Sequence, residues 1–144
     1  MKKWQIYLLI VVILALLTAL YVYVFIYNKP HRNYETATPD YILSSKTLFD
    51  SYKNDKLKAQ KDYNGKVIQI KGNLKNIEDR DSLVVAIFVF GQGDFGDEGI
   101  RCTMIPKFNR EMREFKTTDF LNIKGYCTGY NGTDVILEKC SLVK

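Results

Sequence analysis

The sequence predicts a mainly β protein of the α+β class, with an apolar N-terminal helix, a second helical segment and a small five-stranded barrel. Three observations lead to this fold class. An uncharged apolar run fills residues 4–27, apolar residues recur at helical spacing in residues 44–63, and after Gly65 the period falls from about 3.6 to 2. We therefore expect an anchor over residues 1–28, a juxtamembrane linker over 29–43, and a folded domain with a leading helix over 44–144.

The apolar run from Trp4 to Tyr27 is 24 residues long, and only Gln5 and Thr18 interrupt it with polar side chains. As a helix it would span roughly 36 Å, enough to cross a hydrocarbon core of about 30 Å. A cleaved signal peptide would have an apolar region of about 7–15 residues followed by small residues, whereas aromatic residues end this run. We predict one uncleaved span in the cytoplasmic membrane.

The charge distribution bears on orientation and on ligand class. Lys2 and Lys3 precede the apolar run and Lys29 and Arg32 follow it, so the positive-inside rule slightly favours a cytoplasmic N-terminus. The folded domain would then face the cell envelope. Residues 30–144 hold 18 of the 21 Lys and Arg against 16 Asp and Glu, a difference of +2. A typical nucleic-acid binder concentrates a larger basic excess on one face.

Residues 44–63 have the spacing of an amphipathic helix that ends at Asn64-Gly65. Ser44 or Ser45 is suited to cap its start, and Asn54-Asp55 is expected to divide it into two shorter helices. Its apolar positions are Leu48, Phe49, Tyr52, Leu57 and Tyr63.

Strands are predicted over residues 66–74, 81–90, 100–105, 119–127 and 134–142. The glycine-rich residues 91–99 are expected to be a flexible loop, and residues 109–115 a short helix. Asn131-Gly132 predicts a two-residue turn between the last two strands. Gly72, within the first strand, predicts a bend that lets this strand pair with both ends of the sheet and close a barrel.

Residues 44–143 resemble the bacterial tRNA_anti-like family. The resemblance rests on the aromatic-rich helix that leads into YNGK at residues 63–66, on the bent strand KVIQIKGNL, and on the series IRC, GYCTG and EKC in the later strands. It implies an oligonucleotide/oligosaccharide-binding (OB) barrel, often behind an N-terminal anchor or signal. It supplies no catalytic residues, and we expect no cofactor.

The turn also predicts the register of the last hairpin. Pairing residue 130 with residue 133 would place Cys127 opposite Ile136 and Cys140 opposite Ile123. The two cysteines would then lie four positions apart on one face, about 13 Å at roughly 3.3 Å per residue. This separation is too large for a disulfide between them.

Two interpretations of the cysteines remain open. They are small buried hydrophobic residues, or Cys102 forms one disulfide, with Cys127 or Cys140, in an oxidising compartment. We expect no metal site, because the sequence has no CxxC pair and its one histidine, His31, lies in the linker.

OB barrels bind ligands on the face of their second and third strands and with the neighbouring loops. On this pattern the candidate ligand-contacting residues combine stacking and cationic side chains: Lys75, Arg80, Phe88, Arg101, Tyr126 and Tyr130. The alternative is that Phe88 belongs to the core and that the others are ordinary surface residues.

Catalysis is not expected, because His31 is far from any candidate nucleophile. GQGDFG at residues 91–96 matches a dinucleotide-binding pattern, but a strand rather than a helix follows it. A weak calcium site on Asp94, Asp97 and Glu98 is the minor alternative to a plain loop there. We predict a non-catalytic module that binds a partner protein or an oligomeric ligand. The alternative is a cytosol-facing domain that binds single-stranded nucleic acid near the membrane.

Overall fold

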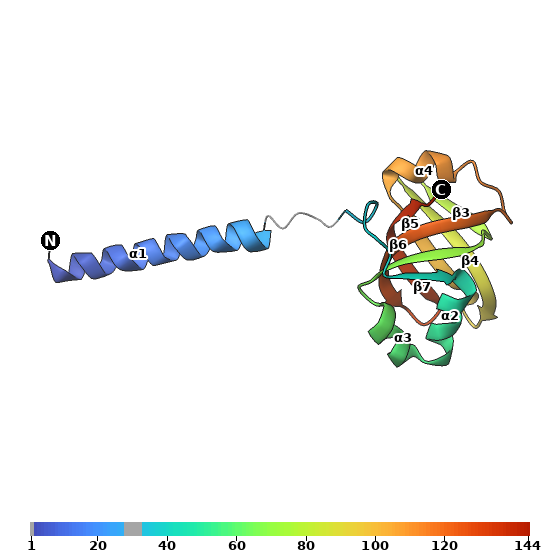
Figure 1. The fold of residues 1–144 in the computed structure, drawn as a ribbon, viewed down its shortest axis with the longest axis horizontal. Helices are drawn as coiled ribbons and strands as arrows, with labels where there is room; N and C mark the ends of the chain where they lie inside the picture. Colours follow the sequence, from blue (N-terminus) through green and yellow to red (C-terminus); the bar gives the residue numbers. More distant parts are fainter. Residues whose placement is uncertain (1, 28–32) are drawn as a thin grey trace. The chain divides into compact units, whose positions relative to one another are not determined.

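Figure 1 shows a computed structural model of the chain, which describes residues 2–27 and 33–144. The chain divides into two compact units, Met1–Arg32 and Asn33–Lys144. The described residues of the first unit are helical, and the second unit is built around a curled β-sheet.

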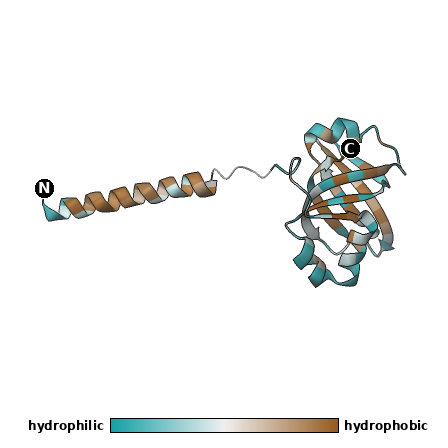
Figure 2. Cartoon of the chain, in the orientation of Figure 1, coloured by the Kyte–Doolittle hydropathy of each residue, from teal (hydrophilic) through white to brown (hydrophobic). Residues whose placement is uncertain are grey.

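The described part of the first unit is one apolar helix. α1 (Lys3–Val22) continues into a short π-helical stretch, η1 (Tyr23–Tyr27), so helical hydrogen bonds satisfy the backbone along the run. None of the residues of α1 is buried, and apolar residues dominate the helix in Figure 2. The Thr18 hydroxyl donates to the carbonyl oxygens of Leu14 (3.0 Å) and Ala15 (2.9 Å). By length and composition this helix can cross a membrane, a test that an N-terminal signal sequence also passes.

The second unit contains a seven-stranded sheet with the strand order β1-β2-β6-β7-β5-β4-β3. The strands are β1 (Tyr41–Ser44), β2 (Val67–Asn73), β3 (Asn76–Arg80), β4 (Leu83–Gly93), β5 (Gly96–Met104), β6 (Phe120–Tyr130) and β7 (Asp134–Leu142). Neighbouring strands are antiparallel except in the pairs β1–β2 and β5–β7. Figure 1 shows the sheet curled into an OB-like barrel, which confirms the predicted fold class.

The chain, rather than a hydrogen-bonded ladder, joins the two halves of this barrel. β2 pairs with β6 and β3 pairs with β4, and only Leu74 and Lys75 separate β2 from β3. At this bend the Leu74 N–H donates to the Asp119 carbonyl and the Lys75 N–H donates to the Ile87 carbonyl. The predicted bend is therefore present, but strand pairing does not close the barrel as expected.

The sheet has seven strands rather than the predicted five. β1 comes from the segment expected to be a linker, where it pairs in parallel with β2. β3 lies between the first two predicted strands, where no strand was expected, because Ile77 is the only apolar side chain in its sequence NIEDR and no alternation reveals the strand. Its ladder with β4 defines it instead.

Helices cover the two ends of the barrel (Figure 1). α2 (Ser45–Asn54) and α3 (Lys56–Tyr63) lie at one end, and α4 (Pro106–Met112) lies at the other. The Ser44 hydroxyl accepts the Thr47 N–H (3.0 Å), and the Asp55 carboxylate accepts the Lys58 N–H (3.0 Å). The predicted division of the helical segment at Asn54-Asp55 is confirmed, because Asp55 caps a new helix there. α4 begins three residues earlier than predicted, since Pro106 suits the first position of a helix.

Residues 33–40, here called the N-terminal strap, pack on the barrel although we expected them to be part of the linker. Lys124 Nζ donates to the carbonyl oxygens of Glu35 and Ala37, both at 2.8 Å. The Tyr34 ring lies 5.0 Å from the Tyr126 ring, and Lys139 Nζ lies 4.9 Å from the Tyr34 ring centroid. The folded unit therefore begins at Asn33 rather than at Ser44. The first part of the expected linker, residues 29–32, lies outside the described residues.

The register of the β6–β7 hairpin differs from the predicted one. The sequence-based register placed Cys127 opposite Ile136 and Cys140 opposite Ile123. The observed pairs include Tyr130–Val135, Cys127–Leu137 and Ile123–Leu142. The turn lies one residue later than predicted, because the Asn131 N–H donates to the Asp134 carbonyl (3.1 Å) and this pair encloses Gly132 and Thr133. Two register shifts in the ladder add to this difference.

One of these irregularities explains why Glu138 is exposed although it follows the buried Leu137 and lies close to the buried Cys140 in β7. Lys139 has a φ of +51°, which changes the alternation of side chains along β7. Glu138 and Lys139 are exposed, whereas Leu137 and Cys140 on either side are buried. The local backbone conformation therefore keeps the Glu138 carboxylate out of the core.

The segment 91–99 is a strand hairpin rather than a flexible loop. β4 extends to Gly93 and β5 begins at Gly96, so only Asp94 and Phe95 connect them. Gly96 has a φ of +113°, a conformation that glycine adopts easily. The Phe95 side chain at the tip is 93% exposed.

Candidate ligand site

The outer face of β3, β4 and β5 carries a groove of about 250 Å³, here called the β-face groove. Asn76, Ile87 and Arg101 form one row across it, because Asn76 pairs with Ile87 and Ile87 pairs with Arg101. This is the face on which OB barrels bind ligands. Its lining is Lys75, Asn76, Glu78, Ile87, Val89, Asp97, Arg101 and Asp134.

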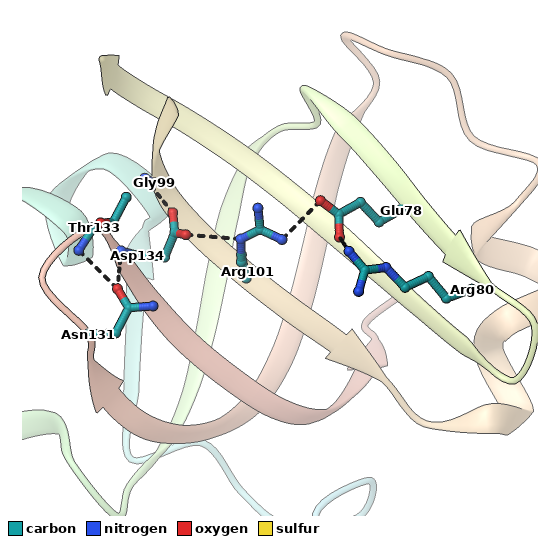
Figure 3. Close-up of polar contacts among 7 residues, drawn as sticks. All are labelled: Glu78, Arg80, Gly99, Arg101, Asn131, Thr133 and Asp134. Carbon is teal, nitrogen blue, oxygen red and sulfur yellow. Dashed lines mark hydrogen bonds and ion pairs between the residues drawn. The ribbon is translucent and has the colours of Figure 1, made fainter. Parts of the chain in front are cut away.

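Arg101 is the central cation of the β-face groove. Its Nε lies 2.9 Å from Asp134 Oδ2, and its Nη1 lies 3.0 Å from Glu78 Oε1, so it connects β7 to β3 (Figure 3). Partial burial opposes the charge, but the bonds to Glu78 and Asp134 outweigh it and raise the pKa of Arg101. Arg80 Nη2 extends the chain of charges at 3.4 Å from Glu78 Oε2.

Asp134 is held rigidly at the start of β7, with only 7% of its surface exposed. Its Oδ1 accepts the Gly99 N–H (3.0 Å), while its own N–H donates to Asn131 Oδ1 (2.7 Å). Asn131 Oδ1 also accepts the Thr133 N–H (2.9 Å), as Figure 3 shows. The turn between β6 and β7 therefore orients the carboxylate that binds Arg101.

The predicted ligand-contacting residues separate into three groups. Lys75 and Arg101 line the β-face groove, and Arg80 is connected to it through Glu78. Phe88 is fully buried, because Val84, Ala86 and Phe88 point into the barrel on alternate positions of β4. Phe88 is therefore a core residue, which is the alternative given for it above, and it does not line the groove.

The two predicted tyrosines do not line the groove. The ring of Tyr126 contacts Tyr34 of the N-terminal strap. Tyr130 packs at 5.7 Å on the ring of Tyr52, and its hydroxyl donates to the Gly132 carbonyl (2.6 Å). Both side chains therefore hold parts of the domain together.

Sequence reasoning missed the acidic side of the groove. Asn76 and Glu78 occupy alternate positions of β3, and Asp97 and Asp134 come from β5 and β7. The signal available was the charged Arg101 inside a strand with apolar neighbours, since such a charge needs a partner. No pattern in the sequence identified which carboxylates would meet it.

The composition of the groove limits what it can bind. Three carboxylates and two cations line it, and no aromatic side chain does. A site that follows a phosphate backbone presents cations and stacking surfaces. This groove instead offers both charge signs next to Ile87 and Val89, a chemistry suited to a mixed polar and apolar ligand.

The three cysteines lie in the core, on β5, β6 and β7, and all are free and fully buried. Burial raises the pKa of the Cys140 thiol, and the neighbouring Cys102 thiol adds to this shift. Burial also raises the pKa of Cys127, although the Tyr52 hydroxyl at 3.3 Å opposes the change. Within residues 2–27 and 33–144, no three His, Cys, Asp or Glu side chains are grouped as a metal site would require.

The fold defines a small OB-type domain that follows an apolar N-terminal helix. The chain belongs to the tRNA_anti-like family, whose model matches residues 1–142, and the resemblance inferred from the sequence is thereby confirmed.

A solved structure shares the fold: a protein from Klebsiella pneumoniae subsp. pneumoniae MGH 78578 described as a "putative nucleic acid-binding lipoprotein". The TM-score is 0.57 at 14% sequence identity, over 72% of this chain and 91% of that one. At this identity the likeness concerns the fold alone. No curated protein matches the sequence significantly.

Proposed function

We propose that this chain is a non-catalytic binding module, held in the cytoplasmic membrane by one uncleaved N-terminal span and facing the cell envelope. Residues 1–28 are the anchor, and the OB-type domain carries the binding surface. Its ligand is a segment of a partner protein that lies in the β-face groove.

The charge network around Arg101 carries this proposal. The guanidinium is already bound to Glu78 and Asp134, and Asp97 adds a third carboxylate to the lining. A nucleic-acid backbone would meet more negative than positive charge here. A protein segment offers both charge signs, backbone hydrogen-bonding groups and apolar side chains, so it can complement every part of the lining. Other oligomeric ligands fit less well, because no aromatic side chain in the lining is available for stacking.

Photocrosslinking in cells tests the binding surface. A photoactivatable amino acid replaces Asp97, which is exposed and lines the groove, or Lys58, which is exposed on α3 and does not line it. We expect light-dependent crosslinks from position 97 to one or a few discrete proteins, and none of these from position 58. Identical products from both positions, or none from position 97, would contradict the proposal.

Protease accessibility tests the orientation. Spheroplasts are treated with a membrane-impermeant protease, and the fate of residues 33–144 is followed with an antibody to this region. We expect digestion without lysis. Protection until lysis would place the domain in the cytoplasm.

A cytosol-facing domain that binds single-stranded nucleic acid is the second candidate function. Two observations favour it: the fold is shared with the Klebsiella protein, and the Klebsiella protein is described as a putative nucleic acid-binding lipoprotein. Fluorescence anisotropy with a labelled single-stranded oligonucleotide at low salt separates the two candidates. We expect no saturable binding, whereas saturable binding that weakens steeply with salt would favour the second candidate.

The three cysteines are unpaired in this structure, and a disulfide of Cys102 with Cys127 or Cys140 in an oxidising envelope stays a prediction. The chain is alkylated after unfolding, with and without a reductant, and weighed by mass spectrometry. One disulfide would leave one alkylated thiol without the reductant, against all three with it. Three alkylated thiols in both samples would assign the cysteines to the core as free thiols.

A further inference from the structure

The bend between β2 and β3 borders a second groove, about 470 Å³ in volume, which the proposed function does not use. It is called the lysine groove here, and the lining residues that matter are Ser45, Lys46, Lys71, Lys75, Phe90 and Phe120. Lys75 and Val89 also line the β-face groove, so the two grooves are neighbours. A volume of this size suits a small ligand.

The lysine groove carries unbalanced positive charge. Three lysines line it and no carboxylate does. Lys46 forms an ion pair with Asp50 at 2.6 Å, but Lys71 and Lys75 have no ion-pair partner in the described part of the chain. Two unpartnered ammonium groups favour a ligand with close to two negative charges. A phosphate monoester carries about −1.5 to −2 at pH 7, more than a single carboxylate.

Ser45 provides an independent indication of a polar ligand. It is the first residue of α2 and is only 2% exposed. Among residues 2–27 and 33–144 the one fully buried side-chain atom without a hydrogen-bond partner is Asn109 Oδ1, so the Ser45 hydroxyl, which also makes no hydrogen bond there, is open to the groove that Ser45 lines. Its Oγ lies over Gly72, where a Cβ would come within 1.9 Å of it, and both residues line the groove. Buried hydroxyls are normally hydrogen-bonded. A phosphate oxygen would supply the missing partner, and the N-terminal end of α2 favours an anion at this place.

Aromatic side chains complete the lining. The Phe120 side chain is 67% exposed beside the lysines, and Phe90 is partly buried behind them. An exposed aromatic ring next to cationic groups can stack on a flat apolar group of the same ligand.

We propose that the lysine groove binds a small phosphate monoester that carries a flat apolar group, the chemistry of a nucleoside monophosphate. Lys71, Lys75 and the Ser45 hydroxyl bind the phosphate, and Phe120 stacks on the flat group. This proposal is independent of the protein partner proposed for the β-face groove.

Calorimetric titration of the full-length chain in a neutral detergent tests it, with adenosine 5′-monophosphate as the probe. We expect saturable binding that K71Q weakens by about tenfold, since a charged group contributes more to binding than a neutral one. K61Q on α3 removes the same charge from an exposed site outside the groove and should leave binding unchanged. S45A removes only the hydroxyl and should weaken binding by about threefold.

Two further probes separate the parts of the site. F120A should weaken binding of the monophosphate but leave the weaker binding of inorganic phosphate unchanged. Adenosine without the phosphate should not bind at the same concentrations.

Three results would overturn the proposal. They are the absence of saturable binding of the monophosphate at low salt, equal losses in K71Q and K61Q, and full binding by S45A. Much tighter binding of a single-stranded oligonucleotide, with steep salt dependence, would also overturn it and favour a nucleic-acid surface. Crosslinking from position 97 should be unaffected by K71Q, so failure here and failure of the protein-binding proposal are distinguishable.

Discussion

The two neighbouring grooves differ in whether their cationic side chains are paired with carboxylates. In the β-face groove Arg101 is bound on both sides by carboxylates, and Asp134 is fixed by backbone hydrogen bonds. In the lysine groove Lys71 and Lys75 have no ion-pair partner among the described residues, and the Ser45 hydroxyl is open to the groove. The first arrangement stabilises the barrel as well as shaping a surface. The second leaves ammonium groups that face solvent and are open to a ligand, so mutations should separate stability from binding.

The largest effect is expected at the close approach of β4 and β5 under the β-face groove. A Cβ at Gly99 would lie 1.7 Å from the Phe88 carbonyl oxygen, which belongs to the backbone and cannot rotate away. We expect Gly99→Ala to lower the free energy of unfolding by about 3 kcal/mol or more. Urea unfolding of the full-length chain in a neutral detergent measures it. A loss below about 1 kcal/mol would show that the strands can separate easily.

Removal of the Asp134 carboxylate is expected to have the next largest effect. Asp134→Ala leaves the Gly99 N–H and one side of the Arg101 guanidinium without partners in a nearly buried position. We expect a loss of about 2–3 kcal/mol. Glu78→Ala is the matched control, and it should cost no more than about 1 kcal/mol because Glu78 is more exposed and binds only side chains. Equal losses would mean that the backbone contacts of Asp134 contribute little.

A smaller effect is expected at the floor of the lysine groove. A Cβ at Gly72 would also collide, but with the Ser45 hydroxyl, which can rotate. We expect Gly72→Ala to cost about 1 kcal/mol, and less in an S45A background, where the Cβ would still meet the residue 45 Cβ at 3.0 Å. The same variant should weaken binding of the monophosphate, because its methyl group would displace the Ser45 hydroxyl. Additive losses in the double variant would show that the two residues do not touch.

The smallest effect on stability is expected for Lys71→Gln. This side chain is exposed and has no ion-pair partner in the described part of the chain, so the free energy of unfolding should change by less than about 0.5 kcal/mol. The same urea unfolding experiment checks it. A stable variant that loses monophosphate binding would separate the two grooves most clearly, while a loss above about 1 kcal/mol would assign Lys71 a structural role.

Much of the fold was accessible from the sequence where local patterns are strong. The apolar run of α1, the division at Asp55 and the period-2 strands each follow from neighbours a few residues apart. β3 could not be predicted from the sequence, because its residues do not alternate between apolar and polar and its strand conformation depends on pairing with β4. The N-terminal strap could not be predicted from the sequence either, because its contacts with Lys124 and Tyr126 join segments far apart in the chain.

The candidate site was less accessible than the fold. Lys75 and Arg101 were predicted on one face from the geometry that OB barrels share, and both line the β-face groove, whereas Phe88, predicted either as a ligand contact or as a core residue, lies in the core. The carboxylates that surround Arg101 come from β3, β5 and β7, and no spacing in the sequence relates them.

By itself the sequence determined an apolar N-terminal helix, the mainly β class, the bend of the first barrel strand and the family resemblance. These depend on hydropathy period and turn residues, which act over a few positions. Only the tertiary structure decided the register of β6 and β7, the partners of Arg101 and the isolation of Lys71. Register and charge pairing depend on a turn displaced by one residue, on bulges and on strands brought together from distant parts of the chain, and a shift of one residue reverses which side chains meet.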